Sequence, residues 1–292
     1  MPILFENIET LAKKLGFAAV GYAPAKELEN EPERYKKSME MGFFANLGYL
    51  ERNLEKRFNP QLLVEGTKSV LVFLAPYGSM ENSSDGYIAT TLSGKYKVAQ
   101  YALGEDYHTV IKSRLNEILA HMQRLDPTII GRVFTDTAPV LERAWAVRAG
   151  LGFIGKNNFL ISRECGIRNF IGVIISNWSP ENTPASDQNN GVPTDLYKKY
   201  CGNCTKCLEA CPTGALCAPY TIDARKCISY LTIEEKGASM PYNVEMAGQR
   251  GGWIFGCDAC MNACPWNSRN KEGWPEFKQK ENPLPISHLR RR

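Results

Sequence analysis

The sequence predicts an α+β protein in which an N-terminal α/β domain precedes a smaller, cysteine-rich domain. Two features support this class. Apolar runs typical of strands alternate with helical patterns over residues 1–177. Beyond them, all of the ten cysteines except Cys165 lie between Cys201 and Cys264. A chain of 292 residues is long enough to form two domains.

The first half of the N-terminal region contains the clearest elements. We predict an amphipathic helix over 7–16, an apolar strand over 18–24 and a polar helical stretch over 29–56. The segment 69–77, SVLVFLAPY, is β-branched and apolar on both faces, as a buried strand should be. Over 107–125, apolar residues recur at three- and four-residue spacing, which predicts an amphipathic helix.

The second half continues the alternation. We predict a strand over 129–136, a helix over 138–150 that ends at a glycine, and two more strands over 158–162 and 169–176. Together these segments indicate one α/β or α+β domain around a sheet.

Composition divides the rest of the chain. Residues 178–195 carry three prolines and many short polar residues, so we predict a linker. The predicted order is then a domain over 1–177, this linker, a cysteine-rich domain over 196–270 and a polar tail over 271–292.

Charge and hydropathy limit the partners. The formal charge of +4 permits contact with a polyanion without indicating a dedicated nucleic-acid coat. The start of the chain lacks a signal-peptide pattern, and no run of about eighteen apolar residues occurs. We therefore expect a cytoplasmic protein with no membrane partner. Cysteines concentrated in such a chain favour metal ligation over disulfides.

The cysteines form two runs. The first fits the bacterial ferredoxin pattern C-x2-C-x2-C-x3-C-P, in which three thiolates hold one 4Fe-4S cluster and the fourth reaches a second. It comprises Cys201, Cys204, Cys207, Cys211 and Pro212. The second run lacks its first cysteine, because Ile254 stands in that place. It comprises Cys257, Cys260, Cys264 and Pro265. We therefore expect a ferredoxin-like domain with two 4Fe-4S clusters.

If the crossing rule holds in both directions, each cluster takes ligands from both runs. One cluster would be held by Cys201, Cys204, Cys207 and Cys264. The other would be held by Cys211, Cys257, Cys260 and a fourth ligand, for which we choose Cys227. Cys217 is a weaker choice because it lies in a turn that must bend away after Pro212, and Cys165 belongs to the other domain.

Structural zinc is the alternative, since paired C-x2-C knuckles also bind zinc. Four cysteines spaced two, two and three apart with a proline behind them favour iron-sulfur clusters. Two adjacent clusters would form an electron relay, which requires a low-potential electron donor and a terminal acceptor.

The N-terminal domain has no G-x-G-x-x-G segment, and GLGFIGKNN at 150–158 lacks the spacing of a phosphate loop. Its conspicuous polar residues are Asp106, His108, Asp136, Arg143, Lys156 and Asn157. Asp136 is a cap or near-cap of the following helix, a carboxyl at the end of a strand that is able to carry a proton if burial raises its pKa, or both. Asp106 and His108 are either a helix cap with a partly buried imidazole or part of a site.

Several segments in this order resemble the epoxyqueuosine reductase family. They are RFNP, GEDYH, DTAPVLERAWAVRAGLGFIGKNNFLI, CGNCTKCLEACPTGAL, CISYLTIE and GCDACMNACPWN. The resemblance covers roughly residues 1–270. It implies a cobalamin, as cob(II)alamin, in the N-terminal domain, supplied with electrons by two 4Fe-4S clusters. The implied reaction removes the epoxide oxygen of epoxyqueuosine at the tRNA wobble position.

The resemblance also implies roles for residues. Asp136 matches the proton donor, with Asp106 and His108 near the substrate. Corrinoid contacts would fall at Arg57, Ala99, Asp136, Leu160, Ile171, Ser229, Cys257 and Asp258, with Ala99 where some members have a cysteine. The signature D-x-H-x-x-G is absent because Ile111 replaces its glycine, so a histidine ligand below the cobalt is not expected.

Many family members continue into a helical-repeat domain that this chain does not show. We expect tRNA contact to rest on the core and on basic residues such as Lys198, Lys199, Lys206, Lys236 and Arg290 to Arg292, and we expect a monomeric or weakly associated protein. Two alternatives remain. One is a short paralogue that cleaves a carbon-heteroatom bond in a small molecule, and the other is a ferredoxin-type electron carrier without a corrinoid.

Overall fold

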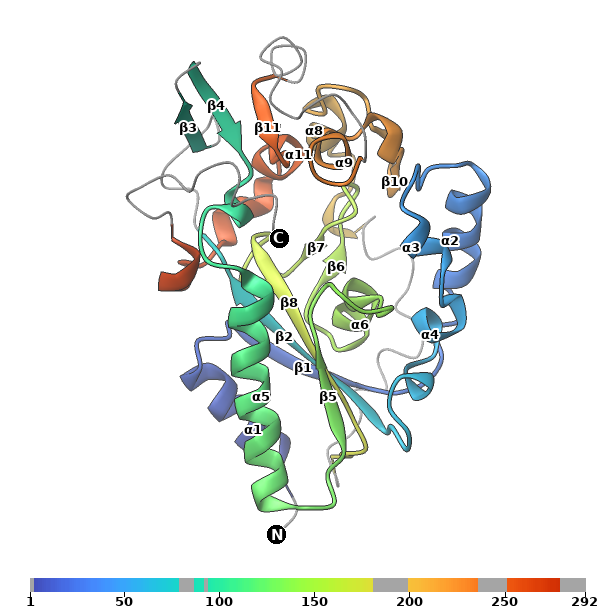
Figure 1. Ribbon diagram of the computed structural model, residues 1–292, viewed down its shortest axis with the longest axis vertical. Helices are drawn as coiled ribbons and strands as arrows, with labels where there is room; N and C mark the ends of the chain where they lie inside the picture. The colour runs from blue at the N-terminus through green and yellow to red at the C-terminus, as the bar shows by residue number, and fades with distance from the viewer. Residues whose placement is uncertain (1–2, 79–86, 92–93, 181–198, 236–250, 279–292) are drawn as a thin grey trace.

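The computed structural model describes residues 3–78, 87–91, 94–180, 199–235 and 251–278 (Figure 1). Most of the predicted linker, the end of the predicted tail and several predicted tRNA contacts, namely Lys198, Lys236 and Arg290 to Arg292, lie outside the described residues.

A four-stranded sheet forms the centre of the N-terminal region. Its order is β1 (Ala19–Pro24), β2 (Ser69–Pro76), β8 (Asn169–Ser176) and β5 (Gly131–Phe134). Every neighbouring pair is antiparallel. The predicted mixture of helix and sheet is confirmed, but the sheet is not the parallel one that an α/β domain implies.

Helices cover both faces of this sheet (Figure 1). The helices α1 (Phe5–Lys14) and α5 (Tyr107–Leu125) pack on one face, and α6 (Glu142–Arg148) packs on the other. Alternate residues of the fully buried β2 join the two cores, with Phe73 in one and Val72 in the other. Burying such a side chain contributes roughly 1.5–3 kcal/mol, so β2 anchors both layers.

Two predicted helices differ from the observed ones. The stretch predicted over 29–56 consists of α2 (Glu31–Glu40), α3 (Gly48–Glu51) and α4 (Leu54–Phe58). Left-handed backbone at Gly42, Ala45 and Asn53 separates them. The helix predicted from 138 begins only at Glu142, whereas α5 matches its predicted bounds.

Short elements make up the rest. They are 3-10 helices at Pro60–Leu62, Gln100–Ala102, Ala224–Lys226, Pro265–Arg269 and Pro275–Phe277; helices α8 (Lys206–Glu209), α9 (Ile228–Ile233) and α11 (Ala259–Asn262); and strands β3 (Tyr87–Thr91), β4 (Gly94–Val98), β6 (Phe153–Ile154), β7 (Leu160–Ile161), β9 (Leu216–Ala218), β10 (Thr221–Ile222) and β11 (Trp253–Phe255). None of the described helices has the length and apolar character needed to cross a membrane.

The cysteine-rich region packs directly on the N-terminal region. Strand β11 pairs in parallel with β4, and Met261 and Cys264 belong to the same buried core as Phe73. Further along the chain, the Trp274 indole donates a hydrogen bond to the Gly16 carbonyl at 2.7 Å. The two predicted domains therefore share a hydrophobic core.

Candidate active site

Asp136 lies in the loop between β5 and α6, with its backbone in the left-handed region at φ 57°. This conformation is uncommon for residues other than glycine. The Asp136 N–H donates to Glu142 Oε1 at 2.5 Å. Because α6 begins only at Glu142, Asp136 does not cap that helix, and the capping interpretation is wrong.

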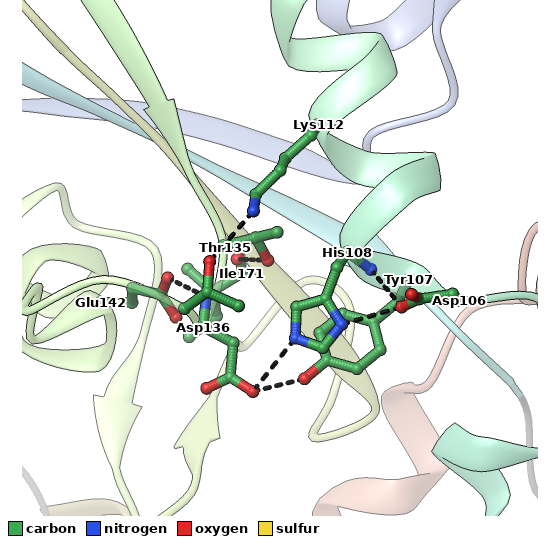
Figure 2. Close-up of polar contacts among 9 residues, drawn as sticks. Asp106, Tyr107, His108, Lys112, Thr135, Asp136, Glu142 and Ile171 are labelled. Atoms are coloured by element: carbon green, nitrogen blue, oxygen red, sulfur yellow. Dashed lines mark hydrogen bonds and ion pairs between the residues drawn. The ribbon is translucent and has the colours of Figure 1, made fainter. Parts of the chain in front are cut away.

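The Asp136 carboxylate meets two aromatic side chains from the start of α5 (Figure 2). The Tyr107 hydroxyl donates to Asp136 Oδ2, and His108 Nε2 lies 3.7 Å from the same oxygen. The other ring nitrogen, His108 Nδ1, is 2.8 Å from Asp106 Oδ1. Asp106 also caps α5, since the same oxygen accepts the His108 N–H at 3.0 Å. The expected helix cap is therefore confirmed, and a role of Asp106 and His108 in a site stays a prediction.

These contacts shift the pKa values of His108 and Asp136. The interaction with Asp136, together with Asp106, raises the pKa of His108 above its usual 6.5 despite burial. The interaction with His108 and then the Tyr107 hydrogen bond lower the pKa of Asp136, although burial opposes them. Burial therefore does not produce the net rise in the pKa of Asp136 that a resting proton would need. The two shifts favour a protonated His108 beside an ionised Asp136.

Two residues of this cluster were missed by sequence reasoning. Tyr107 stacks on Phe170 with ring centroids 4.3 Å apart, and burial and Asp136 raise its pKa. Burial and the neighbouring Asp136 raise the pKa of Glu142 to about 8. Tyr107 stands between the two residues chosen in GEDYH, so its position was a usable signal. The spacing of Glu142 from Asp136 gives no such signal in the sequence.

A cavity of about 1210 Å³ opens beside this cluster. Asp136, Tyr107 and His108 lie on its wall, and the Asp136 side chain is 64% exposed, so the carboxylate is accessible. The cysteine-rich region supplies another part of the wall, with Cys227 and Ser229. One cavity thus joins the acid–base cluster to a cysteine loop.

The expected corrinoid contacts are only partly gathered here. Arg57, Asp136 and Ser229 line the cavity, whereas Ala99, Leu160, Ile171, Cys257 and Asp258 do not. Asp258 is instead buried against Arg168, with Oδ2 3.5 Å from Arg168 Nη1, and accepts the Gln100 N–H at 2.8 Å.

One group of thiols combines both cysteine runs. Burial, and then the neighbouring thiols of Cys201, Cys207 and Cys204, raise the pKa of Cys264 to about 11. Cys264 is therefore close to the three leading cysteines of the first run.

The second group lies around Cys260. Burial raises the pKa of Cys260, with further contributions from nearby Cys257, Cys227 and Cys211. Burial and the thiols of Cys227 and Cys211 likewise raise the pKa of Cys257 to about 12. Buried thiols of this kind need a metal to become thiolates.

The two other cysteines stand apart from these groups. Cys217 is exposed in β9, and Cys165 is buried in the core beneath α6. Within the described ranges, no three His, Cys, Asp or Glu side chains converge closely enough to hold a single metal ion.

Comparison with known proteins identifies the family. A model described as a 4Fe-4S double cluster binding domain matches residues 200–267, and one described as epoxyqueuosine reductase QueG, DUF1730, matches residues 57–137. The chain is 40% identical over 264 residues to the epoxyqueuosine reductase of Cyclobacterium marinum, covering 90% of this chain and 79% of that relative. The chain belongs to the epoxyqueuosine reductase family.

Solved structures agree with this membership. The epoxyqueuosine reductase of Bacillus subtilis is 28% identical with a TM-score of 0.76, over 94% of this chain and 68% of that one. The epoxyqueuosine reductase of Streptococcus thermophilus is 27% identical with a TM-score of 0.75, over 93% of this chain and 68% of that one. As an epoxyqueuosine reductase family member, the chain is an oxidoreductase with a double 4Fe-4S cluster domain.

Proposed function

We propose that this enzyme reduces the epoxide of epoxyqueuosine in tRNA to give queuosine. One solved epoxyqueuosine reductase, 28% identical with a TM-score of 0.75, is bound to an epoxyqueuosine-modified tRNA stem loop. The match covers 94% of this chain and 68% of the solved one. The exposed Lys199 and Lys206 of the cysteine-rich region are available to a phosphate backbone.

The observation that carries the proposal is the shared cavity. The ionisable groups of Asp136, Tyr107 and His108 line the same space as Cys227 and Ser229. Reduction of an epoxide to an alkene takes up two electrons and two protons, breaks both carbon-oxygen bonds and releases water. A site for this reaction must deliver electrons and protons to one place, which this cavity allows.

The two groups of thiols would hold the clusters. We assign one cluster to Cys201, Cys204, Cys207 and Cys264. We assign the other to Cys211, Cys227, Cys257 and Cys260. The grouping of the thiols around Cys264 and Cys260 supports this crossed arrangement. It also brings Cys227, a ligand of the second cluster, to the cavity wall.

The cavity also suits a large cofactor. At about 1210 Å³ it exceeds the roughly 300–1,000 Å³ of ordinary ligand pockets. Arg57, Asp136 and Ser229 would contact a corrinoid there, and Ala99, Leu160, Ile171, Cys257 and Asp258 remain proposed contacts. When bound, a reduced corrinoid would supply a strongly electron-donating cobalt to the epoxide.

The protein would supply the protons. Asp136 Oδ2 faces both the Tyr107 hydroxyl and His108 Nε2, so a proton can pass from His108 to Asp136 and on to the leaving epoxide oxygen. Asp106 orients the imidazole through Nδ1. The B. subtilis relative has been solved with an aspartate-bearing catalytic loop swung out of its active site. A comparable movement of the Asp136 loop would carry its carboxylate away from the substrate, and the reverse movement would return it.

The test is turnover by the anaerobically purified protein with cobalamin, a reductant and tRNA carrying epoxyqueuosine. Mass spectrometry of the digested nucleosides should show queuosine replacing epoxyqueuosine. A protein loaded with corrinoid and both clusters that does not convert this tRNA would point to a small-molecule substrate. Clusters without any bound corrinoid would point to an electron carrier.

A further inference from the structure

The hairpin turn between β6 and β7, residues 155–158, has no part in the chemistry above. The Gly155 N–H donates to the Phe159 carbonyl at 2.8 Å, and the Asn158 N–H donates to the Gly155 carbonyl at 2.9 Å. Asn158 takes the left-handed conformation at φ 66°. From this turn the side chains of Lys156 and Asn157 reach the cysteine loops.

Lys156 makes four contacts with the cysteine-rich region. Its ammonium donates to the carbonyls of Gly202 at 2.7 Å and Cys204 at 2.9 Å. Its own carbonyl accepts the Tyr220 N–H at 2.9 Å. Burial raises the pKa of Cys201, and the N–H and the charge of Lys156 act against that rise. Lys156 thus binds the loop from Cys201 to Cys204, which carries the first two cysteines of the run.

The charge of Lys156 is buried without an acidic partner. The residue is 8% exposed, and the partners found for Nζ within the described part of the chain are the uncharged carbonyls of Gly202 and Cys204. Buried charges are normally paired, because removing them from water costs several kcal/mol per ion. The Lys156 charge acts on the Cys201 thiol, so the thiolates of the first cluster would place negative charge beside this ammonium.

Asn157 completes the turn. It is 3% exposed, and its amide Nδ2 lies 3.5 Å from the Cys260 carbonyl of the second run. The turn therefore touches both cysteine loops, and only Lys156 brings a charge.

We propose that Lys156 is a positioning residue that holds the Cys201 to Cys204 loop and raises the reduction potential of the cluster bound there. Iron-sulfur potentials depend on net charge and on hydrogen bonding around the sulfurs. A fixed positive charge favours the reduced cluster, which carries one more negative charge. This inference rests on the double-cluster part of the proposed function, but its test requires no turnover of epoxyqueuosine.

The experiment is a redox titration of the two clusters, followed by electron spin resonance, together with iron analysis. Lys156→Met removes the charge and its hydrogen bonds, and Lys156→Gln removes the charge while keeping a donor. In both variants we expect about eight irons per chain. One of the two reduction steps should become at least tenfold less favourable, about 59 mV for one electron.

Two controls isolate the charge. Lys156→Arg keeps it and should retain the wild-type potentials. Lys206→Met removes an exposed charge from the same cysteine run and should also leave them unchanged, since solvent screens that charge.

Unchanged potentials in both Lys156→Met and Lys156→Gln would overturn the proposal. If those variants lose one cluster instead, recovery of the iron in Lys156→Arg supports a requirement for the charge. Loss of the cluster in all three variants contradicts the proposal. The loop would then depend on the shape of the lysine side chain and not on its charge.

Discussion

Asp136 combines strain, accessibility and polar contacts in one residue. Its left-handed backbone aims the carboxylate at Tyr107 and His108 and leaves it 64% exposed. Strained backbone persists where surrounding contacts hold it, and here Glu142 accepts the backbone N–H. The raised pKa of His108 and the lowered pKa of Asp136 favour the proton on His108, so in the proposed mechanism Asp136 would pass a proton on rather than store it.

Asp136→Asn should lower turnover of epoxyqueuosine-containing tRNA by about 100-fold or more, the usual contribution of general acid catalysis. Iron and corrinoid contents should stay at wild-type levels. Asp126→Asn, at the far end of α5, is the matched control and should keep full activity. Full turnover by the Asp136 variant would remove this residue from the mechanism.

His108 should make stability depend on pH. A histidine whose folded pKa is raised stabilises the fold fully below its unfolded pKa, here 6.5, and loses that contribution as pH rises through the folded pKa. Urea denaturation should therefore show His108→Gln to be most destabilising below pH 6.5 and less so above it. A cost of His108→Gln that does not change with pH would contradict this expectation.

The loop between β5 and α6 shows how one element depends on the next. Helix α6 begins only at Glu142, and the side chain of this residue accepts a hydrogen bond from the Asp136 N–H. With its pKa raised to about 8, Glu142 is mostly neutral at pH 7 and still accepts the hydrogen bond.

We expect Glu142→Ala to lower kcat about tenfold, because a hydrogen bond worth roughly 1–2 kcal/mol no longer holds the loop. Glu142→Gln keeps an oxygen acceptor without charge, so it should restore most of the activity. Single-turnover assays near pH 7 separate the two variants. Equal losses in both would show that Glu142 acts through its charge.

The cysteine loops allow a similar comparison. Cys227→Ala should lower the iron content from about eight to about four per chain, since it removes the proposed fourth ligand of the second cluster. Cys217→Ala should keep all of the iron, because this exposed thiol lies in β9, apart from both groups. Iron analysis after anaerobic purification distinguishes the two, and the reverse result would exchange their roles.

The whole molecule is held together across its predicted domain boundary. Strand β11 joins β4, the turn at Lys156 grips the Cys201 loop, and Trp274 packs into the core against Phe17 and Arg114. The Arg114 guanidinium stacks 3.6 Å from the centre of the Trp274 ring. Such contacts attach the cysteine-rich region to the N-terminal region.

Trp274→Ala should lower the free energy of unfolding by about 3–5 kcal/mol, as expected when a buried tryptophan leaves a cavity. Ile130→Ala, at a side chain that is 58% exposed, should cost about 0.5 kcal/mol or less. Denaturant unfolding of the two variants measures this. A Trp274 variant as stable as the wild type would show that the C-terminal segment adds little to the core.

The sequence by itself predicted much of this protein because its strongest signals are local. The periodicity of α5, the apolar run of β2 and the cysteine spacing each depend on neighbouring residues, and they identified helix, strand and cluster motif. The positions of Asp106 and His108 also followed from the start of a helix.

Only the tertiary structure decided the rest, because it depends on contacts between distant segments. The antiparallel order of the sheet comes from the pairing of β8 with both β2 and β5. The lowered pKa of Asp136 comes from side chains of α5, and the role of Lys156 comes from carbonyls 46 and 48 residues away. Spacing along the chain cannot report charges and hydrogen bonds that folding brings together.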